Sequence, residues 1–439
     1  MSVLFLVLFV ALAIAPSSPG QENAAPVIPK ANAASQSATV TPAPAPPAAP
    51  APNASPTELG GIKIIKGSSD LTPTTKPFVH PGIYYNAPDL DFMRQKLAAH
   101  AEPWASAWEK NKPTPRDDAW TPHAVADWDA TKDFYMGGDP VVAHKEALAW
   151  AITGNQANAD VAIKILNAWA STLQTIIPHP AMPQEKLSTG ADAAQLCNAA
   201  ELLLHGGPSG KSSGWSDADV QKFKSMLQIQ YATMKGFFPG FNGNWDLIIM
   251  DSVISIAVFL DDPKMFDEAL QEYIVGQKPN GGIINYVYPS GQCQESPRDQ
   301  GHVQWGLGNA VAVCQVAWKQ GVDIYGAYDN RLLTGLEYTA KYNLGNEVPF
   351  EPTGRATAIS PKGRGQFAYI WEAPSQHYVV RRGLEMPYTK QIVESTSVLS
   401  GFGKTPAPYR PELEFVVGIN WGTLTMYKGE EDPQAAKKQ

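Results

Sequence analysis

Cysteine is scarce in this sequence, and the spacings typical of metal sites are missing. Three cysteines, Cys197, Cys293 and Cys314, occur in 439 residues. Their odd number leaves at least one thiol unpaired, and the sequence does not fix whether the other two form a bridge. No CxxC or HxxxH spacing is present, so we expect no structural metal and no cofactor.

Positive charge is also in short supply. The formal net charge is −8, which weighs against nucleic acid or another nonspecific polyanion as a partner. A local basic site could still hold an acidic sugar. Twelve Trp and sixteen Tyr residues supply flat, amphipathic rings that suit stacking on sugar faces, although most aromatic residues in a chain of this size belong to the core.

Long apolar runs are confined to the first residues, MSVLFLVLFVALAIA. This run is short for a membrane span and has the length of a signal-peptide core, with small residues at Ala11, Ala13 and Ala15 as cleavage sites. No Lys or Arg precedes it, and a signal anchor is the alternative. We expect a signal peptide over residues 1–20, a secreted or periplasmic protein, no membrane-spanning domain in the mature chain, and a monomer.

Composition divides the rest of the chain into three parts. Residues 21–77 are dominated by Ala, Pro, Ser and Thr, for example ATVTPAPAPPAAPAP, and such a segment cannot bury enough apolar surface to offset its ordering entropy. We expect a disordered linker there. A folded domain over residues 78–427 follows, and a charged tail over residues 428–439 ends the chain.

Apolar residues recur at steps of three and four through most of the folded part, which predicts helices. The clearest segments are residues 141–150, 159–170, 191–204, 217–234, 248–260, 263–275, 302–320 and 331–342. Short Gly, Pro or Asn connections join them into successive helical hairpins. We therefore predict a mainly α fold, an (α/α) toroid, because no fixed-period repeat supports a solenoid. FAYIW, YVV and FVVGI could add a few short strands near the C-terminus.

The stretch NGGIINYVYPSGQCQESPRDQGHVQWGL, residues 280–307, gathers the densest set of reactive side chains. Ser290-Gly291 and Pro297 predict a loop leading into a helix that starts at about Pro297. Arg298 and His302 would then share one helical face. Glu295 precedes the first turn, where a carboxylate is favoured. A catalytic patch is one interpretation, and a capped helix with a surface salt bridge is the other.

A second polar cluster, GFNGNWD at residues 240–246, precedes an apolar helix. Asn244 and Trp245 could present an amide and an aromatic platform to a ligand, or they could be ordinary helix-capping and packing residues. His144 lies four residues before Leu148 on the helical period. We expect a satisfied, half-buried histidine there, with a place in the same cleft as the alternative.

Several of these segments resemble the alginate lyase superfamily, especially its branch of glucuronan- and alginate-degrading lyases. The resembling elements, over roughly residues 135–350, are HKEALAWAITGN, ILNAWA, NGNWD, PSGQCQESPRDQGH, QGVDIYG and DNRLLTGLEYTAKYNLG. The resemblance implies an (α/α) toroid that cleaves uronic-acid polysaccharides by β-elimination. The expected partner is therefore an acidic polysaccharide substrate.

β-Elimination removes the proton at C5 of the uronate and expels the oxygen at C4. The carboxylate charge must be offset as the enolate-like state forms, and Asn244 and Arg298 are the candidates. His302 with Tyr288 or Tyr286 could supply the base and the acid. The remaining candidates, all for substrate binding, are Tyr286, Glu295, Trp245, His144 and Gln292.

The sequence departs from the better-known alginate lyases at one place. Those enzymes carry an asparagine–histidine pair before the apolar helix, whereas this chain has Asn244-Trp245. We expect His302, or His144 from another helix, to replace the missing histidine.

Two other functions compete with elimination. A glycoside hydrolase needs two carboxylates across the scissile bond, which Glu295, Asp299 and Asp246 could provide. A non-catalytic polysaccharide-binding protein is the third hypothesis, and it would not need a titratable pair beside an arginine. The preferred uronate and the choice between endo and exo attack are not encoded in any motif of this sequence.

Overall fold

The computed structural model describes residues 58–59, 61–114, 116, 119–130, 132–133, 135–237, 241–353, 356–396 and 422–436. They belong to one unit that spans Ala54–Gln439. The predicted signal peptide and most of the predicted linker lie outside the described residues.

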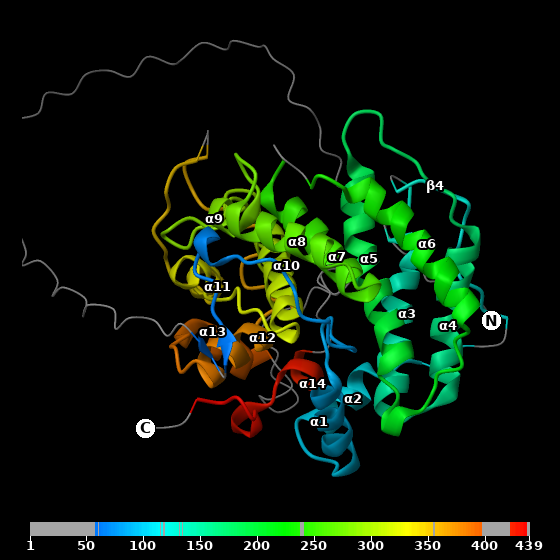
Figure 1. Ribbon diagram of the computed structural model, residues 1–439. Helices are drawn as coiled ribbons and strands as arrows, with labels where there is room; N and C mark the ends of the chain where they lie inside the picture. The colour runs from blue at the N-terminus through cyan, green and yellow to red at the C-terminus, as the bar shows by residue number, and fades with distance from the viewer. Residues whose placement is uncertain are drawn as a thin grey trace, which may run out of the picture. The chain divides into compact units, whose positions relative to one another are not determined.

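Helices build nearly all of this unit (Figure 1). In chain order they are α1 Ala87–Ala98, α2 Trp104–Asn111, α3 Asp139–Thr153, α4 Gln156–Thr172, α5 Gln184–His205, α6 Asp217–Met234, α7 Gly243–Leu260, α8 Pro263–Val275, α9 Gly282–Tyr286, α10 Gln300–Lys319, α11 Ala327–Asn343, α12 Glu372–Ser375, α13 Pro387–Thr396 and α14 Gly422–Met426. Each of the eight segments with helical periodicity lies within or closely overlaps one of them.

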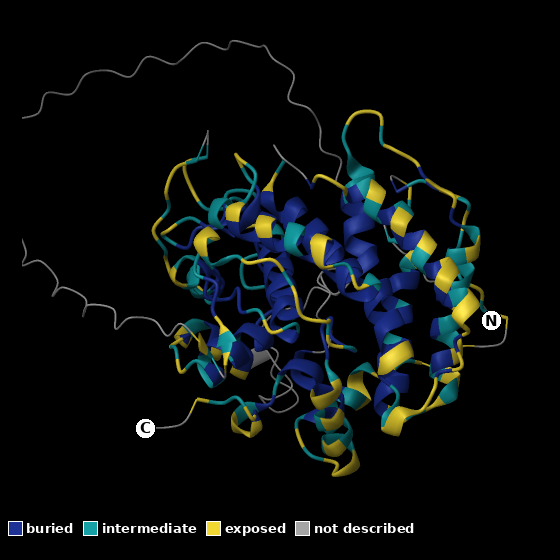
Figure 2. Cartoon of the chain, viewed as in Figure 1, coloured by how far each residue is buried: buried dark blue, intermediate teal, exposed yellow. Residues whose placement is uncertain are grey.

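The helices form two layers, as expected for an (α/α) toroid. Neighbouring helices α3, α5, α7 and α10 pack side by side, and α4, α6, α8 and α11 pack on them as the second helices of hairpins. The first set is almost entirely buried, whereas the second exposes one face (Figure 2). The predicted fold class is therefore confirmed.

Side-chain pattern explains which helix takes which layer. Helix α4 buries one stripe, Ala159, Ala162, Ile165, Leu166 and Trp169, at the spacing of a single helical face. Helix α7, GNWDLIIMDSVISIAVFL, is apolar on every face. It is long and apolar enough to cross a membrane, but 94% of it is buried inside the protein, so its apolar faces contact other helices.

The few short strands lie near the beginning of the described chain, not near its C-terminus. Strands β1 Glu58–Leu59 and β2 Ile62–Lys63 pair antiparallel, and β3 Asp127–Trp128 pairs in parallel with β4 Thr175–Ile176. The strand expected at FAYIW is a loop that leads into α12, and YVV lies in the π-helical segment Gln376–Arg381. A short apolar run does not distinguish a strand from a buried helix. FVVGI lies outside the described residues.

Ordered packing begins earlier than the predicted boundary at residue 78. The Ile65 N–H donates to the Asp323 carbonyl at 2.7 Å, and the Ile65 side chain is buried. The Thr74 hydroxyl donates to Asp267 at 2.6 Å. Residues 61–77 therefore pack on the helices, although their composition resembles that of the linker before them.

The predicted charged tail also packs on the helices. The Lys428 ammonium donates to Asp89 at 2.6 Å, and the Arg381 guanidinium donates to Asp432 at 2.8 Å. All four side chains are buried. Lys428 and Asp432 therefore form buried ion pairs and do not belong to a solvated tail.

These contacts predict different outcomes for two truncations. Removing residues 1–57 should leave the melting temperature unchanged. Removing residues 1–75 should lower it clearly, because Ile64 and Ile65 lose burial worth about 1.5–3 kcal/mol each along with the hydrogen bond to Asp323. Thermal unfolding followed by circular dichroism checks both. Equal melting temperatures for the two truncated proteins would contradict the packing of residues 61–77.

Candidate active site

Three of the four predicted catalytic residues, Asn244, Arg298 and His302, lie at or just before the N-terminal ends of α7 and α10, two neighbouring inner helices. Tyr288 lies in the loop between α9 and α10. Helix α10 begins at Gln300, and its N-cap is Asp299, whose side chain accepts a hydrogen bond from the His302 N–H at 2.8 Å. The predicted start at Pro297 is therefore three residues early. Arg298 lies in the preceding turn, where its N–H donates to the Glu295 carbonyl at 2.9 Å, and it does not share a helical face with His302.

Asp299 also orients the His302 ring. The Nδ1 atom lies 2.8 and 2.9 Å from the two Asp299 oxygens. Burial opposes the charge of Asp299, yet hydrogen bonds from His302 and the nearby Lys362 ammonium hold the pKa of this carboxyl well below its usual range. An ionised Asp299 requires Nδ1 to carry the proton. That leaves Nε2 as the lone-pair atom.

The His302 side chain is 20% exposed, and its Nε2 has no hydrogen-bond partner among the described residues. An imidazole that is held at Nδ1 by a carboxylate and belongs to a partly exposed side chain has the geometry of a general base. The Asp299–His302 pair is the part of the patch that is best prepared for proton transfer.

Arg298 and Glu295 form a second pair beside the first. Arg298 Nη1 lies 3.4 Å from Glu295 Oε2, and the Arg298 side chain is 34% exposed. Burial raises the pKa of Glu295, and the Arg298 charge opposes that shift. Arg298 uses one nitrogen for this contact, so other N–H groups of its planar fork can meet a carboxylate from solution.

Asn244 lies in the first turn of α7 and is 0% exposed. Neither its amide oxygen nor its amide nitrogen has a hydrogen-bond partner in the described part of the chain. The adjacent Gly243 donates its N–H to the Gln294 side-chain oxygen at 2.9 Å. This hydrogen bond holds the first turn of α7 against residues 280–294. A buried amide without partners is costly, so a polar ligand group that reached it would be stabilised.

Tyr286 and Gln292, expected to bind substrate, instead hold the loop in place. The Tyr286 ring is fully buried, its hydroxyl donates to the Val303 carbonyl at 3.2 Å, and it fills the space beside Gly306 that a Cβ would occupy. The Gln292 amide makes two hydrogen bonds to the Glu351 backbone, at 2.9 and 2.7 Å. The structure thus gives both side chains a supporting role, which the sequence did not indicate because it shows the residue type but not the direction of the side chain.

Tyr288 and Trp245, the other two aromatic candidates, differ: Tyr288 has a hydroxyl without a described partner, whereas the Trp245 ring packs against another ring. Tyr288 is half-buried, burial raises the pKa of its hydroxyl, and that hydroxyl has no hydrogen bond to a described residue. It is a neutral donor at ordinary pH. Trp245 is buried and stacks on Phe241, with ring centroids 5.2 Å apart and planes 15° apart. Its ring face is therefore used in packing.

His144 is buried in the core, more deeply than the predicted half-buried position. Its Nδ1 lies 2.6 Å from the Gln195 side-chain oxygen, and its ring packs near Tyr84 and Tyr85. Burial lowers the pKa of His144 to about 4. It is a neutral core histidine, and it does not line an open cleft.

The contact between Asp299 and His302 was not predicted from the sequence. Asp299 was expected only as a carboxylate of the competing hydrolase. The signal was present, because an Asp three residues before a His at a helix start can both cap the backbone and contact the ring.

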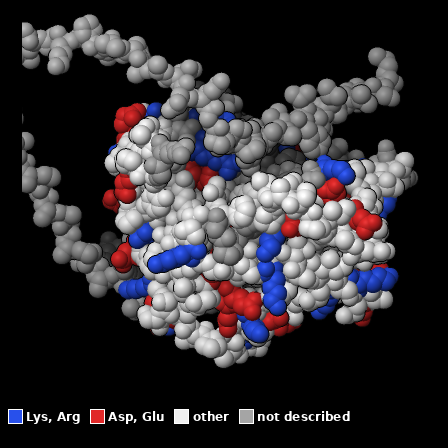
Figure 3. Space-filling view, turned by 90° about the horizontal axis from the view of Figure 1, so that it is seen from above, with Lys and Arg blue, Asp and Glu red and all other residues white. Residues whose placement is uncertain are grey.

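The view from above shows basic and acidic side chains meeting in a hollow of the surface (Figure 3).

Comparison with known proteins identifies the helical region. Residues 141–350, just under half of the chain, match the family model described as alginate lyase. These residues are therefore similar to the alginate lyase family. Among curated proteins no sequence matches.

Solved structures of alginate lyases share the fold. Alginate lyase A1-III from Sphingomonas species A1 is 15% identical, with a TM-score of 0.52 over 77% of this chain and 95% of that chain. A variant of the same lyase complexed with a tetrasaccharide is 14% identical, with a TM-score of 0.53 over 78% of this chain and 94% of that chain. At these identities the likeness establishes the toroid and does not assign residue roles.

One group of described side chains outside this patch has spacing that could suit a metal ion. The donor atoms of His80, Glu201 and His205 lie within 4.8 Å of one another. His80 already bridges two carboxylates, with Nδ1 3.0 Å from Glu201 and Nε2 3.1 Å from Asp261. A protonated His80 satisfies these contacts without an ion.

This bridge predicts a pH-dependent contribution to stability. The hydrogen bond that His80 donates to Glu201 is the main cause that raises the pKa of His80 from 6.5 to about 9. The folded state therefore holds this proton more tightly than the unfolded state. The stabilisation is full below pH 6.5 and is lost as pH rises through 9.

His80→Gln should have a lower melting temperature than the native protein at pH 6, and the difference should shrink by pH 10. Melting curves across that range check this prediction, with the exposed His100→Gln as the matched control. A difference that stays constant with pH would contradict a charged His80 bridge.

Proposed function

We propose that this protein cleaves a uronic-acid polysaccharide, alginate or glucuronan, by β-elimination. The match of residues 141–350 to the alginate lyase family model supports polysaccharide lyase activity. The observation that carries the proposal of β-elimination is the Asp299–His302 pair. The His302 Nδ1 lies 2.8 Å from the Asp299 carboxylate, and the His302 side chain is partly exposed.

In this mechanism His302 Nε2 takes the proton from C5 of the uronate. The electron pair of that C–H bond forms the C4–C5 double bond, and the C4–O bond breaks. Tyr288, with its raised pKa, donates its proton to the leaving oxygen. Arg298 and the unpartnered amide of Asn244 stabilise the carboxylate as negative charge moves onto it.

Trp245 stands where a histidine base would lie on α7, which favours a base on α10. This residue follows Asn244, where the better-known alginate lyases have histidine, and its ring is buried against Phe241. Trp245 has no group that can accept a proton. His302 is the remaining histidine of the patch, because His144 is enclosed in the core.

The carboxylates are poorly arranged for glycoside hydrolysis. Asp299 is bound to His302, and the buried Glu295 contacts Arg298. The buried Asp246 accepts a hydrogen bond from the Gly282 N–H at 3.2 Å. A hydrolase needs two carboxyl groups that face the scissile bond, and these three are engaged within the protein. A protein that only binds polysaccharide would have no need for an oriented imidazole.

The same proposal includes export of the protein and an acidic polysaccharide partner. The apolar first residues support a secreted or periplasmic location. The expected partners remain an acidic polysaccharide and neither nucleic acid nor a second copy of the chain.

Incubation with alginate, glucuronan and a neutral glucan tests the reaction class. We expect ultraviolet-absorbing unsaturated ends from a polyuronate and no product from the glucan. Reducing ends without ultraviolet absorption would indicate hydrolysis, and no product from any polymer would indicate a binding protein. Product lengths followed over time would then distinguish endo from exo attack.

The proposed dyad, the Asp299–His302 pair, leads to a sharper prediction. His302→Ala should lower kcat by roughly a hundredfold or more, the scale of a general base. Asp299→Asn should have a comparable effect, because asparagine still caps a helix but its amide donates to Nδ1 and forces the proton onto Nε2. Steady-state kinetics and melting temperatures, measured on the same preparations, check both variants.

The matched control is Asp262→Asn, the same change at the N-cap of α8, where Asp262 accepts from the Met265 N–H at 3.0 Å. It should leave kcat unchanged. If Asp299→Asn lowers the melting temperature and keeps kcat per folded molecule, Asp299 is only a cap and the proposed dyad is wrong.

Arg298 is expected to act through charge. Arg298→Ala should lower kcat about as much as His302→Ala through loss of charge stabilisation, and Arg298→Lys should recover only part of it because the planar fork is lost. Both variants should melt near the native temperature, since Arg298 is partly exposed. Full activity in Arg298→Ala would remove this residue from the site.

A further inference from the structure

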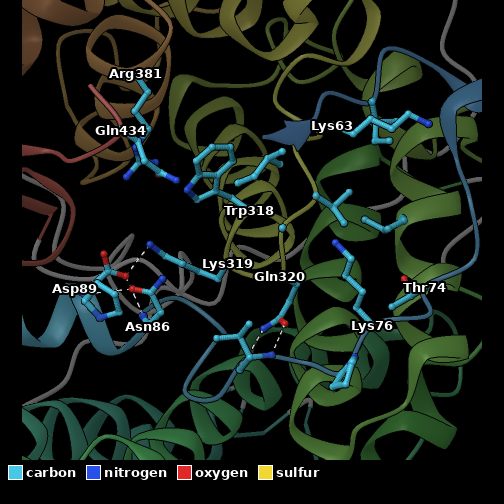
Figure 4. A pocket seen from close by; sticks show the side chains of 18 of the residues that line it. Lys63, Thr74, Lys76, Asn86, Asp89, Trp318, Lys319, Gln320, Arg381 and Gln434 are labelled. Carbon is cyan, nitrogen blue, oxygen red and sulfur yellow. Dashed lines mark hydrogen bonds and ion pairs between the residues drawn. The ribbon is translucent and has the colours of Figure 1, made fainter. Parts of the chain in front are cut away.

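A cavity of about 590 Å³ lies near the far end of α10 from the candidate active site. Its wall includes Trp318 and Lys319, the last residues of α10, together with parts of residues 62–79 and 428–434 (Figure 4). His302 and Lys319 are separated by 17 helical positions, roughly 25 Å along the axis. The cavity is therefore separate from the Asp299–His302 pair.

Three buried cations meet two buried carboxylates at this cavity. The Lys319 and Lys428 ammonium groups share Asp89, each at 2.6 Å. Arg381 pairs with Asp432 at 2.8 Å. All five side chains line the cavity and are buried. Among these described residues the positive charges outnumber the negative charges by one.

An excess buried charge is costly unless an anion compensates it. Burial lowers the pKa of Lys319 to about 8, although Asp89 opposes the shift, and the neighbouring Lys428 and Arg381 lower it further. The ammonium groups therefore repel one another across the site. A further negative charge in the cavity would remove that repulsion.

The cavity rim adds positive charge and groups that can bind hydroxyls. The exposed Lys76 lies across the cavity from Lys319 (Figure 4), and no described residue forms an ion pair with it. Lys63 also lines the cavity, and its ammonium donates to the Asp70 carbonyl at 2.8 Å. Thr72 and Gln434 line the same space. This concentration of cations contrasts with the net charge of −8 of the chain.

We propose that this cavity binds a sugar carboxylate, a uronate of one or two residues, at a site separate from the catalytic one. The carboxylate lies among Lys319, Lys428 and Lys76, and the polar wall receives the hydroxyls. A volume of about 590 Å³ falls in the range of small-molecule sites. The choice of a uronate over other carboxylates rests on the proposed function, whose lyase products carry this group.

Isothermal titration of the native full chain with sodium glucuronate tests the proposal. This monosaccharide has no glycosidic bond to cleave, so binding is measured without turnover. We expect saturable binding, and at least tenfold weaker binding of glucose and of inorganic phosphate. Equal affinity for glucose would rule out carboxylate recognition, and equal affinity for phosphate would mean that the cavity selects charge and not a sugar.

Lys319→Met is the decisive variant. It removes the excess charge and leaves Asp89 paired with Lys428, so the variant should fold while glucuronate affinity falls at least tenfold. Lys76→Met, at an exposed position, should weaken binding about threefold to tenfold and provides a second test if Lys319→Met does not fold. Lys222→Met, on the outer face of α6, is the matched control and should bind as the native protein does.

Arg298→Ala shows where the ligand binds. Glucuronate binding should persist in this variant, because Arg298 belongs to the other end of α10. Binding that Arg298→Ala abolishes and Lys319→Met preserves would assign the ligand to the catalytic patch and overturn the proposal. The polymer assay on the same preparations separates the two ideas: lyase activity without cavity binding refutes only this inference, and cavity binding without lyase activity refutes only the proposed function.

Discussion

The candidate active site depends on one carboxylate that satisfies a helix end and an imidazole together. Asp299 accepts the His302 N–H and meets the His302 Nδ1, both at 2.8 Å. The first contact fixes where α10 begins, and the second fixes the tautomer that leaves Nε2 available. Since one side chain makes both contacts, the direction of the base is set by the backbone of an inner helix and not by a mobile loop.

Close packing between α7 and α10 brings the rest of the patch to this helix end. Gly306 has no side chain, and the Tyr286 ring fills that space and donates its hydroxyl to α10. Gln294 holds the first turn of α7 through Gly243. Tyr286 and Gln294 thus contribute as supports. The Asn244 amide and the Tyr288 hydroxyl have no hydrogen-bond partner among the described residues, and the Arg298 fork contacts only Glu295 there.

The helices were predictable from sequence because apolar periodicity is a local signal, and each predicted segment has its helix. The candidate site was predicted from ESPRDQGH and NGNWD, and the structure brings these two segments to the starts of neighbouring helices. The roles within it were only partly predictable, because they depend on contacts between distant segments. Gln292 binds the backbone at Glu351, and His144 meets Gln195 on another helix. The packing of residues 61–77 was hidden by a Pro- and Thr-rich composition.

The ion pair between Asp89 and Lys428 joins residues 339 positions apart. It closes nearly the whole described chain into a single loop. Because closing so long a loop costs entropy, we expect this contact to form late in folding. During synthesis the toroid helices emerge before Lys428 does. Asp89 can therefore pair with Lys319 first, and with Lys428 only when the chain is almost complete. Formation of this pair is thus a natural marker that both ends of the fold have docked.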